Sequence, residues 1–248
     1  MSSTPIVIAL LALALAPRPA AAAELRILAG GSMTTVLTTL APAFEKASGH
    51  TLAIHFDSTP NLIKQALAGP FDLGIVPVDV MADPAARARF APEPPTPIAH
   101  VGYGIAIRAG ATRPDLSTPD AFRQSLLDAK SIAFLPTSAA GAQVVRVFEQ
   151  LGIGDAMKAK TVLQPTPADI PKAVAAGQAE LGVFLINVLT APGVELAGPF
   201  PPPLQTELAF TGAVAAAPPN PEAARAFIAF MASPGAVAVI KAKGMTPG

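Results

Sequence analysis

The chain alternates short apolar runs with segments whose apolar residues recur every three or four positions. The short runs are typical of buried β-strands, and the periodic segments are typical of amphipathic helices. The pattern predicts strands at 25–30, 51–56, 71–78, 102–110, 131–136, 181–186 and 208–216. It predicts helices within 32–48, 57–69, 81–97, 117–130, 137–151, 168–178, 221–232 and 234–243. Strands that alternate with helices in this way indicate an α/β fold with mainly parallel sheets.

The distribution of proline indicates two lobes. Pro-rich stretches at 92–97 and 199–203 come directly before two predicted strands, and the segment 108–200 forms a set of βα units by itself. We predict that the chain leaves a first lobe, builds a second and returns, so that a ligand cleft lies between the lobes. The alternative is one doubly wound sheet without a hinge. The predicted divisions are a signal sequence at 1–23, lobe 1 at 24–104, lobe 2 at 105–206 and a return to lobe 1 at 207–248.

The N-terminal residues have the pattern of an export signal. Residues 6–16 are 11 consecutive apolar residues, and Ala21, Ala22 and Ala23 match the small-x-small motif that precedes signal cleavage. A run of this length is too short for a bilayer, which needs about 20 residues. We therefore predict cleavage before Glu24 and a periplasmic location.

Composition excludes several classes of function. Cysteine is absent, which rules out disulfides and thiolate metal sites. Loss of Arg18 with the signal leaves 16 of the 17 basic residues against 17 acidic residues, a net charge of −1, and no cluster predicts a nucleic-acid partner. The histidines at positions 50, 55 and 100 lack the spacing of metal ligands. We expect no metal, no cofactor, no nucleic acid and a monomeric protein.

Three predicted strands lead into helices through small or hydroxyl-bearing residues, at 29–33, 57–61 and 137–141. Each helix start leaves backbone N–H groups unpaired and carries the positive end of the helix dipole. In parallel α/β folds such starts gather beside the carboxyl ends of the strands. Together they would form an anion site that needs no Lys or Arg. The alternative is that Ser32, Thr59 and Ser138 only cap their helices.

Several segments resemble a known family. "LRILAGGSMTTVLTTLAPAFEKASG" and "FDSTPNLIKQALAGPFDLGIVP" are similar to the start of the periplasmic molybdate-binding proteins, which are class II periplasmic solute-binding proteins. "TSAAGAQVVRVFEQLGI", "ADIPKAVAAGQAELGVFL" and "EAARAFIAFMASPGAVAVIKAKGM" are similar to later parts of the same family, in the same order. The resemblance implies two lobes, each a mixed, mainly parallel sheet flanked by helices, joined by two crossing strands. It also implies closure on a small anion, an oxyanion or a small carboxylate, for delivery to an ABC permease in the inner membrane.

The resemblance also implies which residues contact the ligand. They are Ser32, Thr59 with the adjacent Ser58, and the backbone N–H groups of Ala140, Gly141 and Ile170. The turns themselves add Gly31, Met33 and Ser138 to the predicted ligand-binding residues. The tyrosine that donates in the family falls on Leu185 here, and a lost hydrogen bond to a charged ligand costs about 1.5–3 kcal/mol. Asp57 adds a carboxylate beside the site. The resemblance therefore supports the scaffold more strongly than it supports molybdate.

The same scaffold also resembles that of a periplasmic aconitate isomerase, which acts on a small tricarboxylate. Moving a proton beside a carboxylate needs a base and donors that hold the anion. His55 and Asp57, which flank the second turn, are the candidate catalytic residues of this alternative. Equally, His55 alternates with Ile54 and Phe56 and so fits the polar face of a strand. Binding without catalysis is our main prediction.

Overall fold

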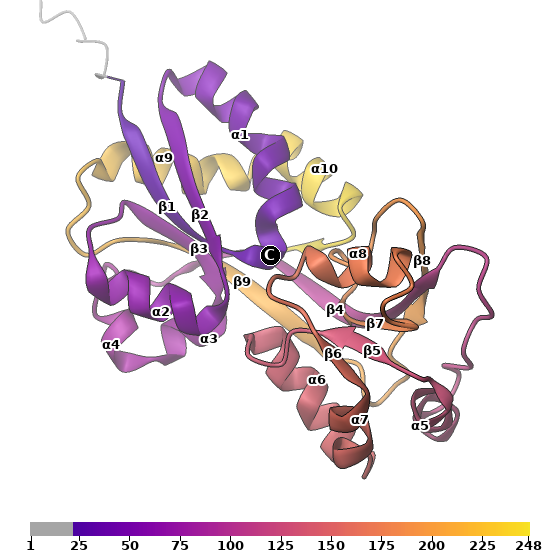
Figure 1. Ribbon diagram of the computed structural model, residues 1–248. Helices are drawn as coiled ribbons and strands as arrows, with labels where there is room; N and C mark the ends of the chain where they lie inside the picture. The colour runs from indigo at the N-terminus through magenta and orange to yellow at the C-terminus, as the bar shows by residue number, and fades with distance from the viewer. Residues whose placement is uncertain (1–21) are drawn as a thin grey trace, which may run out of the picture.

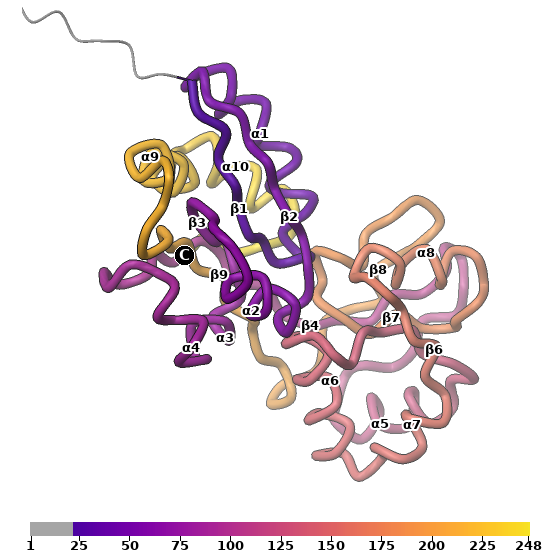
Figure 2. The backbone as a smooth tube through the Cα atoms, turned by 60° about the vertical axis from the view of Figure 1, so that its left-hand side comes forward, coloured from indigo at the N-terminus to yellow at the C-terminus, as the bar shows by residue number. Residues whose placement is uncertain are grey.

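Two lobes, each a β-sheet flanked by helices, lie side by side (Figures 1 and 2). The computed structural model describes residues 22–248, so the predicted signal sequence at 1–23 lies almost wholly outside them. The predicted α/β fold with mainly parallel pairing is confirmed. The predicted lobe boundaries stay predictions.

The first lobe is built on strands in the order β2-β1-β3-β9-β4. β1 pairs in parallel with β2 and β3, and β9 returns antiparallel between β3 and β4. The strands are β1 (Glu24–Gly30), β2 (Thr51–Asp57), β3 (Leu73–Pro77), β4 (Thr96–Arg108), β9 (Glu207–Val214) and β10 (Thr246–Pro247). The helices are η1 (Gly31–Met33), α1 (Thr34–Ser48), α2 (Thr59–Ala68), α3 (Val78–Ala82), α4 (Pro84–Arg87), α9 (Pro221–Met231) and α10 (Pro234–Ala242).

The second lobe continues the sheet in the order β4-β7-β5-β6, with β8 also paired to β4. Its strands are β5 (Ile132–Phe134), β6 (Thr161–Leu163), β7 (Leu181–Leu185) and β8 (Val194–Pro199). Its helices are α5 (Pro119–Asp128), α6 (Ala139–Gln150), α7 (Gly154–Lys160) and α8 (Asp169–Ala175). The sequence pattern did not predict β6, α7 or β8, whose residues are mostly only partly buried and therefore give a weak hydrophobic pattern.

β4 crosses from one lobe to the other. Its first part pairs with β9, and from Tyr103 onward it pairs with β7 and β8. At the change of partner the Gln205 side chain substitutes for a strand, since it accepts from Tyr103 N at 3.0 Å and donates to Tyr103 O at 2.8 Å. β4 begins at Thr96, six residues before the predicted start at position 102. The strand can include Pro97, which has no N–H to donate, because its pairing with β9 shifts register there.

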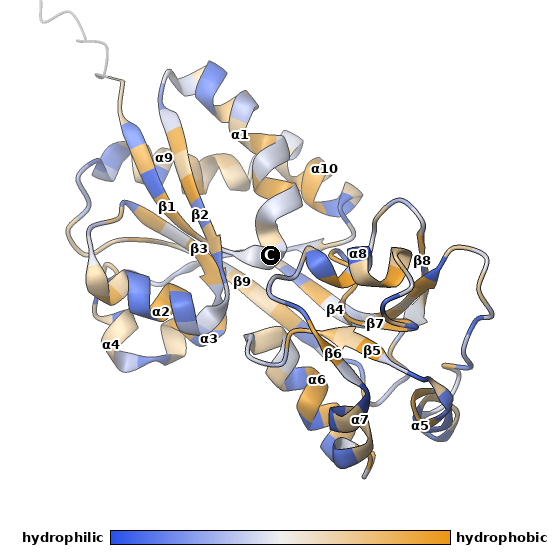
Figure 3. Cartoon of the chain, in the orientation of Figure 1, coloured by the Kyte–Doolittle hydropathy of each residue, from blue (hydrophilic) through white to orange (hydrophobic). Residues whose placement is uncertain are grey.

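Apolar side chains fill the space between sheet and helices. Figure 3 colours the same chain by the hydropathy of each residue. On α1 the buried residues recur at helical spacing: Val36, Leu37, Leu40 and Phe44. Within residues 22–248 no single helix is long and apolar enough to cross a membrane. Only α9 and α10 together reach that length, with a bend of 59° between them.

The carboxylate of Asp72 is fully buried in the first lobe, and its removal should measurably lower the stability of the fold. Asp72 accepts from the backbone N–H groups of Arg26 at 2.8 Å and Asn220 at 2.9 Å, which ties β1 to the start of α9. Asp72→Ala leaves these donors unpaired, so we expect the free energy of unfolding to fall by about 3 kcal/mol. Thermal melting should then show a drop of about 6–12 °C. The exposed substitution Glu93→Ala is the control, and an equal effect of the two changes would contradict this role.

Candidate functional site

The three hydroxyl-bearing turns meet at one cavity between the lobes. Each turn contributes a run of lining residues, and apolar side chains complete the wall. The lining comprises Gly30, Gly31, Ser32, Asp57, Ser58, Thr59, Pro77, Ser138, Ala139, Ala140, Pro167, Phe184, Leu208 and Phe210. The volume open to the centre of a water molecule is about 20 Å³. The convergence of turns from both lobes, which the anion-site prediction requires, is therefore present in the structure.

The first turn presents a free hydroxyl. Ser32 lies inside the 3₁₀ turn η1, one residue before Met33 and the start of α1, so it does not cap that helix. Its side chain is nearly buried against the cavity and makes no hydrogen bond to any described residue. Met33 does not line the cavity, because its side chain is wholly buried in the core.

The second turn differs by one residue from the predicted cap. Ser58, rather than Thr59, occupies the N-cap position of α2, and it makes no side-chain capping bond. Thr59 is the first helical residue and lines the cavity with its hydroxyl unbonded to any described residue. Both hydroxyl groups on this turn are therefore available to a ligand, apart from a long 3.4 Å contact between Ser58 Oγ and Asp57 Oδ1.

At the third turn, two of the predicted contact groups are bonded within the protein. Ser138 caps α6, because its Oγ accepts from Gly141 N at 3.0 Å and donates to Leu135 O at 2.9 Å. The Gly141 N–H and the Ser138 proton thus already have partners within the protein. The donors left at this turn are the backbone N–H groups of Ala139 and Ala140, whose residues line the cavity.

Two positions that align with ligand-contacting residues of the family, Ile170 and Leu185, do not line the cavity. Ile170 N donates to Pro167 O at 3.2 Å and the residue is fully buried, so it is Pro167 that lines the cavity here. Leu185 is buried too, and the strand face at the cavity belongs to Phe184. Neighbouring residues of a strand point to opposite faces, so only one of Phe184 and Leu185 can face the cavity. This alternation is the sequence signal that could have pointed to Phe184 as the other candidate.

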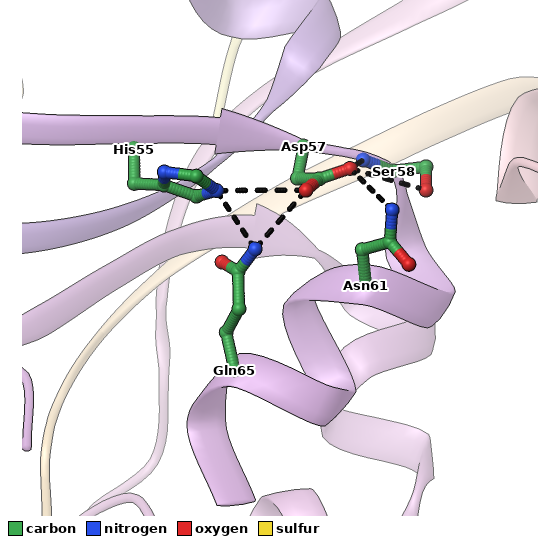
Figure 4. A network of polar contacts seen from close by, with 5 residues as sticks. All are labelled: His55, Asp57, Ser58, Asn61 and Gln65. Atoms are coloured by element: carbon green, nitrogen blue, oxygen red, sulfur yellow. Dashed lines mark hydrogen bonds and ion pairs between the residues drawn. The ribbon is translucent and has the colours of Figure 1, made fainter. Parts of the chain in front are cut away.

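A polar network surrounds Asp57 at the end of β2 (Figure 4). One carboxylate oxygen accepts from Ser58 N at 2.7 Å and from Asn61 Nδ2 at 2.8 Å. The other accepts from Gln65 Nε2 at 3.0 Å and lies 3.5 Å from His55 Nε2. The sequence indicated Asp57 and His55, but the partners on α2 depend on how that helix packs.

These contacts keep Asp57 ionised. Partial burial is the largest single influence and opposes ionisation, but hydrogen bonds from Asn61, Ser58, His55 and Gln65 together hold the pKa of the carboxyl below its usual value. Asp57 therefore places a negative charge on the cavity wall. Among the described lining residues there is no Lys or Arg to balance it. The available positive potential is that of the helix starts.

The network predicts a titration result. Asn61→Ala removes one donor to the carboxylate, so the pKa of Asp57 should rise toward that of an ordinary aspartate, as NMR titration of the side-chain carboxyl would measure. Because the folded pKa is depressed, the donor stabilises the fold above the unfolded pKa of about 3.9, and the benefit disappears as pH falls through the folded pKa. An unchanged pKa in Asn61→Ala would contradict this account.

His55 lies outside the cavity lining. Its side chain is 58% exposed, and its Nε2 is 2.7 Å from Gln65 Nε2. As the candidate base of the catalytic alternative, His55 therefore reaches the cavity only through Asp57. Asp57 itself is one of the residues that line the cavity.

Comparison with known proteins places this geometry in a family. Residues 25–246 match the model of the bacterial extracellular solute-binding proteins. The chain is 32% identical to an aconitate isomerase from Pseudomonas sp. over 252 residues, which covers 97% of this chain and 95% of that protein. Its fold is similar to that of the periplasmic molybdate-binding protein of Azotobacter vinelandii, with a TM-score of 0.74 at 22% identity, covering 90% of this chain and 99% of the other.

A second solved structure is the substrate-binding domain of a putative molybdenum ABC transporter from Clostridium difficile. It has a TM-score of 0.66 at 18% identity and covers 91% of this chain and 99% of the other. At these identities the structures show the fold, whereas the family model spans nearly all the described residues. This chain belongs to the bacterial extracellular solute-binding protein family.

Proposed function

We propose that this chain is a periplasmic solute-binding protein whose lobes close on a small organic anion with carboxylate groups and deliver it to an ABC permease. The observation that carries the proposal is one cavity lined both by the uncharged donors of three turns and by Asp57, whose carboxyl is kept ionised. The hydroxyls of Ser32 and Thr59 and the N–H groups at Ala139 and Ala140 are the donors to the anion. We expect the protein to act as a monomer.

Asp57 favours an organic acid over an inorganic oxyanion. At 4 Å and an effective dielectric constant of 20, each unit of like charge costs about 4 kcal/mol. A tetrahedral dianion presents charged oxygen atoms in every direction and cannot avoid Asp57. A carboxylic acid can direct its carboxylates to the helix starts and turn an uncharged part toward Asp57 and the rings of Phe184 and Phe210.

The test is thermal melting of the purified mature protein against separate anions. The panel contains trans-aconitate, citrate, succinate, molybdate, tungstate, sulfate and phosphate. A ligand at one hundred times its Kd stabilises by about 2.7 kcal/mol, and such a gain corresponds to roughly 5–11 °C for a chain of this size. We expect a carboxylate to produce that shift. A shift with molybdate or tungstate and none with the carboxylates would contradict the proposed ligand class.

A second candidate function is isomerisation of a small unsaturated tricarboxylate, and the observation that favours it is Asp57 itself. An ionised carboxylate on the wall of an anion site is placed as a base, and the relative that is 32% identical over nearly the whole chain is an aconitate isomerase. In such a reaction Asp57 takes a methylene proton of the substrate, and the electron pair delocalises over three carbons between two carboxylates. The proton returns at the other end of the three carbons, which moves the double bond, so no co-reactant is consumed.

Turnover separates the two functions. NMR of trans-aconitate incubated with the protein in D₂O would reveal isomerisation and deuterium uptake together. If the chain is an isomerase, Asp57→Asn should lower the rate by about 10²–10⁴ while binding persists. His55→Ala should have a smaller effect, because His55 acts through Asp57. Binding of trans-aconitate with no turnover in the unmodified protein would exclude this second function.

A further inference from the structure

Asn187 lies where the two lobes meet. It lies two residues after the end of β7, beside the crossing strand, and the neighbouring Ile186 N donates to Gly102 O at 3.0 Å. The side chain is buried, with only 2% of the residue exposed. A buried amide at the junction of two lobes needs hydrogen-bond partners, and the partners that it finds depend on how the lobes are arranged.

The partner of Asn187 belongs to the opposite lobe. Its Nδ2 donates to Ser32 O at 2.7 Å, across 155 positions of the sequence. The bond lies beside the crossing strand β4, and among the hydrogen bonds of residues 22–248 it is the one from the second lobe to the turn that carries Ser32. The bond holds the carbonyl group of the Ser32–Met33 peptide, which belongs to the residue whose hydroxyl lines the cavity.

The other half of the amide has no partner. Asn187 Oδ1 is buried and accepts no hydrogen bond from the described residues. Burying an unpaired acceptor opposes the arrangement that the Nδ2 bond favours. The favourable Nδ2 bond and the unfavourable burial of Oδ1 therefore partly cancel. Asn187 contributes less to the contact between the lobes than an amide with both groups paired.

We propose that Asn187 is the latch of this protein, a positioning residue that holds the lobes together and fixes Ser32 over the ligand. The identity of the ligand in this proposal rests on the proposed function, and the latch itself rests on the bond from Asn187 to Ser32. The unpaired Oδ1 keeps the closed arrangement marginal without ligand, so that contacts from the anion decide closure and release.

Distances between labels on the two lobes test the latch. The chain has no cysteine, so Lys64→Cys in α2 and Gln150→Cys in α6, both exposed, accept spin labels selectively. Asn187→Asp keeps the shape but turns the donor into an oxygen that faces Ser32 O. We expect it to reduce the population at the short distance of the structure at least tenfold and to weaken trans-aconitate binding by about tenfold or more. Asn187→Leu removes the donor without adding charge and should lose about two- to tenfold in affinity.

Thr190→Val is the matched control, because Thr190 Oγ1 bonds Asn187 O at 3.4 Å in the same turn and does not touch Ser32. It should leave the distances unchanged. Equal distance distributions in Asn187→Asp and the unmodified protein, with and without trans-aconitate, would overturn the latch. A lower melting temperature with unchanged distances would also overturn it, since that result indicates packing alone. If trans-aconitate fails to bind the unmodified protein, the proposed ligand is wrong, and the ligand-free distances still decide the latch.

Discussion

Replacing Ser32 and Thr59 together by alanine should weaken binding of trans-aconitate by about 10²–10⁴-fold. Both hydroxyls line the cavity and have no hydrogen-bond partner among the described residues, so each can donate to the anion. A hydrogen bond to a charged group contributes about 1.5–3 kcal/mol, and two such losses give this range. Isothermal titration calorimetry measures the change directly.

The fold should survive this double substitution. Neither hydroxyl caps a helix, in contrast to Ser138, so the melting temperature without ligand should stay within a few degrees. The control removes two hydroxyls from the outer face of α1, with Thr38→Ala and Thr39→Ala, which bond only to their own helix. Affinity that persists in the Ser32 and Thr59 variant would show that the ligand binds elsewhere.

Gly141→Ala should destabilise the protein by about 3 kcal/mol or more. A Cβ atom at this position would lie 1.7 Å from Leu135 O, and this atom belongs to the backbone, so no side chain can move aside. Overpacking costs typically about 1–3 kcal/mol where the core can adjust, and the loss here should reach or exceed the upper end. Chemical denaturation should show a lower midpoint at an unchanged slope.

The consequence for the site is as important as the loss of stability. α6 must retreat from Leu135 to admit the methyl group, which moves Ala139 and Ala140 away from the cavity that they line. Affinity for the ligand should therefore fall even at temperatures where the variant is folded. Gly154→Ala at the start of α7 is the control, because its Cβ would meet only Glu149 Cγ at an ordinary 3.7 Å. Equal stability of the two variants would contradict the close approach at Gly141.

The location of the site could be predicted from sequence because its signals are local. Glycine, serine and threonine between a strand and a helix limit the turn conformation and expose N–H groups, wherever the turn lies in the fold. Parallel strands then carry such turns to one edge of a sheet. For this reason the turns at Ser32, Thr59 and Ala140 were correctly expected to meet.

Which donors remain free could not be predicted in the same way. Gly141 N donates to Ser138 Oγ, and the Ser138 hydroxyl donates to Leu135 O. Ile170 N likewise donates to Pro167 O, because a helix start takes the nearest acceptor when one is in reach. The same motif therefore leaves donors open in one turn and occupies them in another. The choice depends on single rotamers and on backbone positions that composition does not encode.

The amino-acid pattern was enough to predict the α/β alternation, the hydroxyl-bearing turns and the carboxylate at the end of β2, since these depend on periodicity and on residue chemistry over a few positions. Tertiary structure alone decided that Phe184 rather than Leu185 faces the cavity, that α2 supplies the donors around Asp57, and that Asn187 reaches Ser32. These features depend on strand register and on lobe packing, which bring together residues as far as 155 positions apart. A long connecting chain does not fix the distance between two such residues. Their distance is fixed only when the strands and lobes pack in the folded protein.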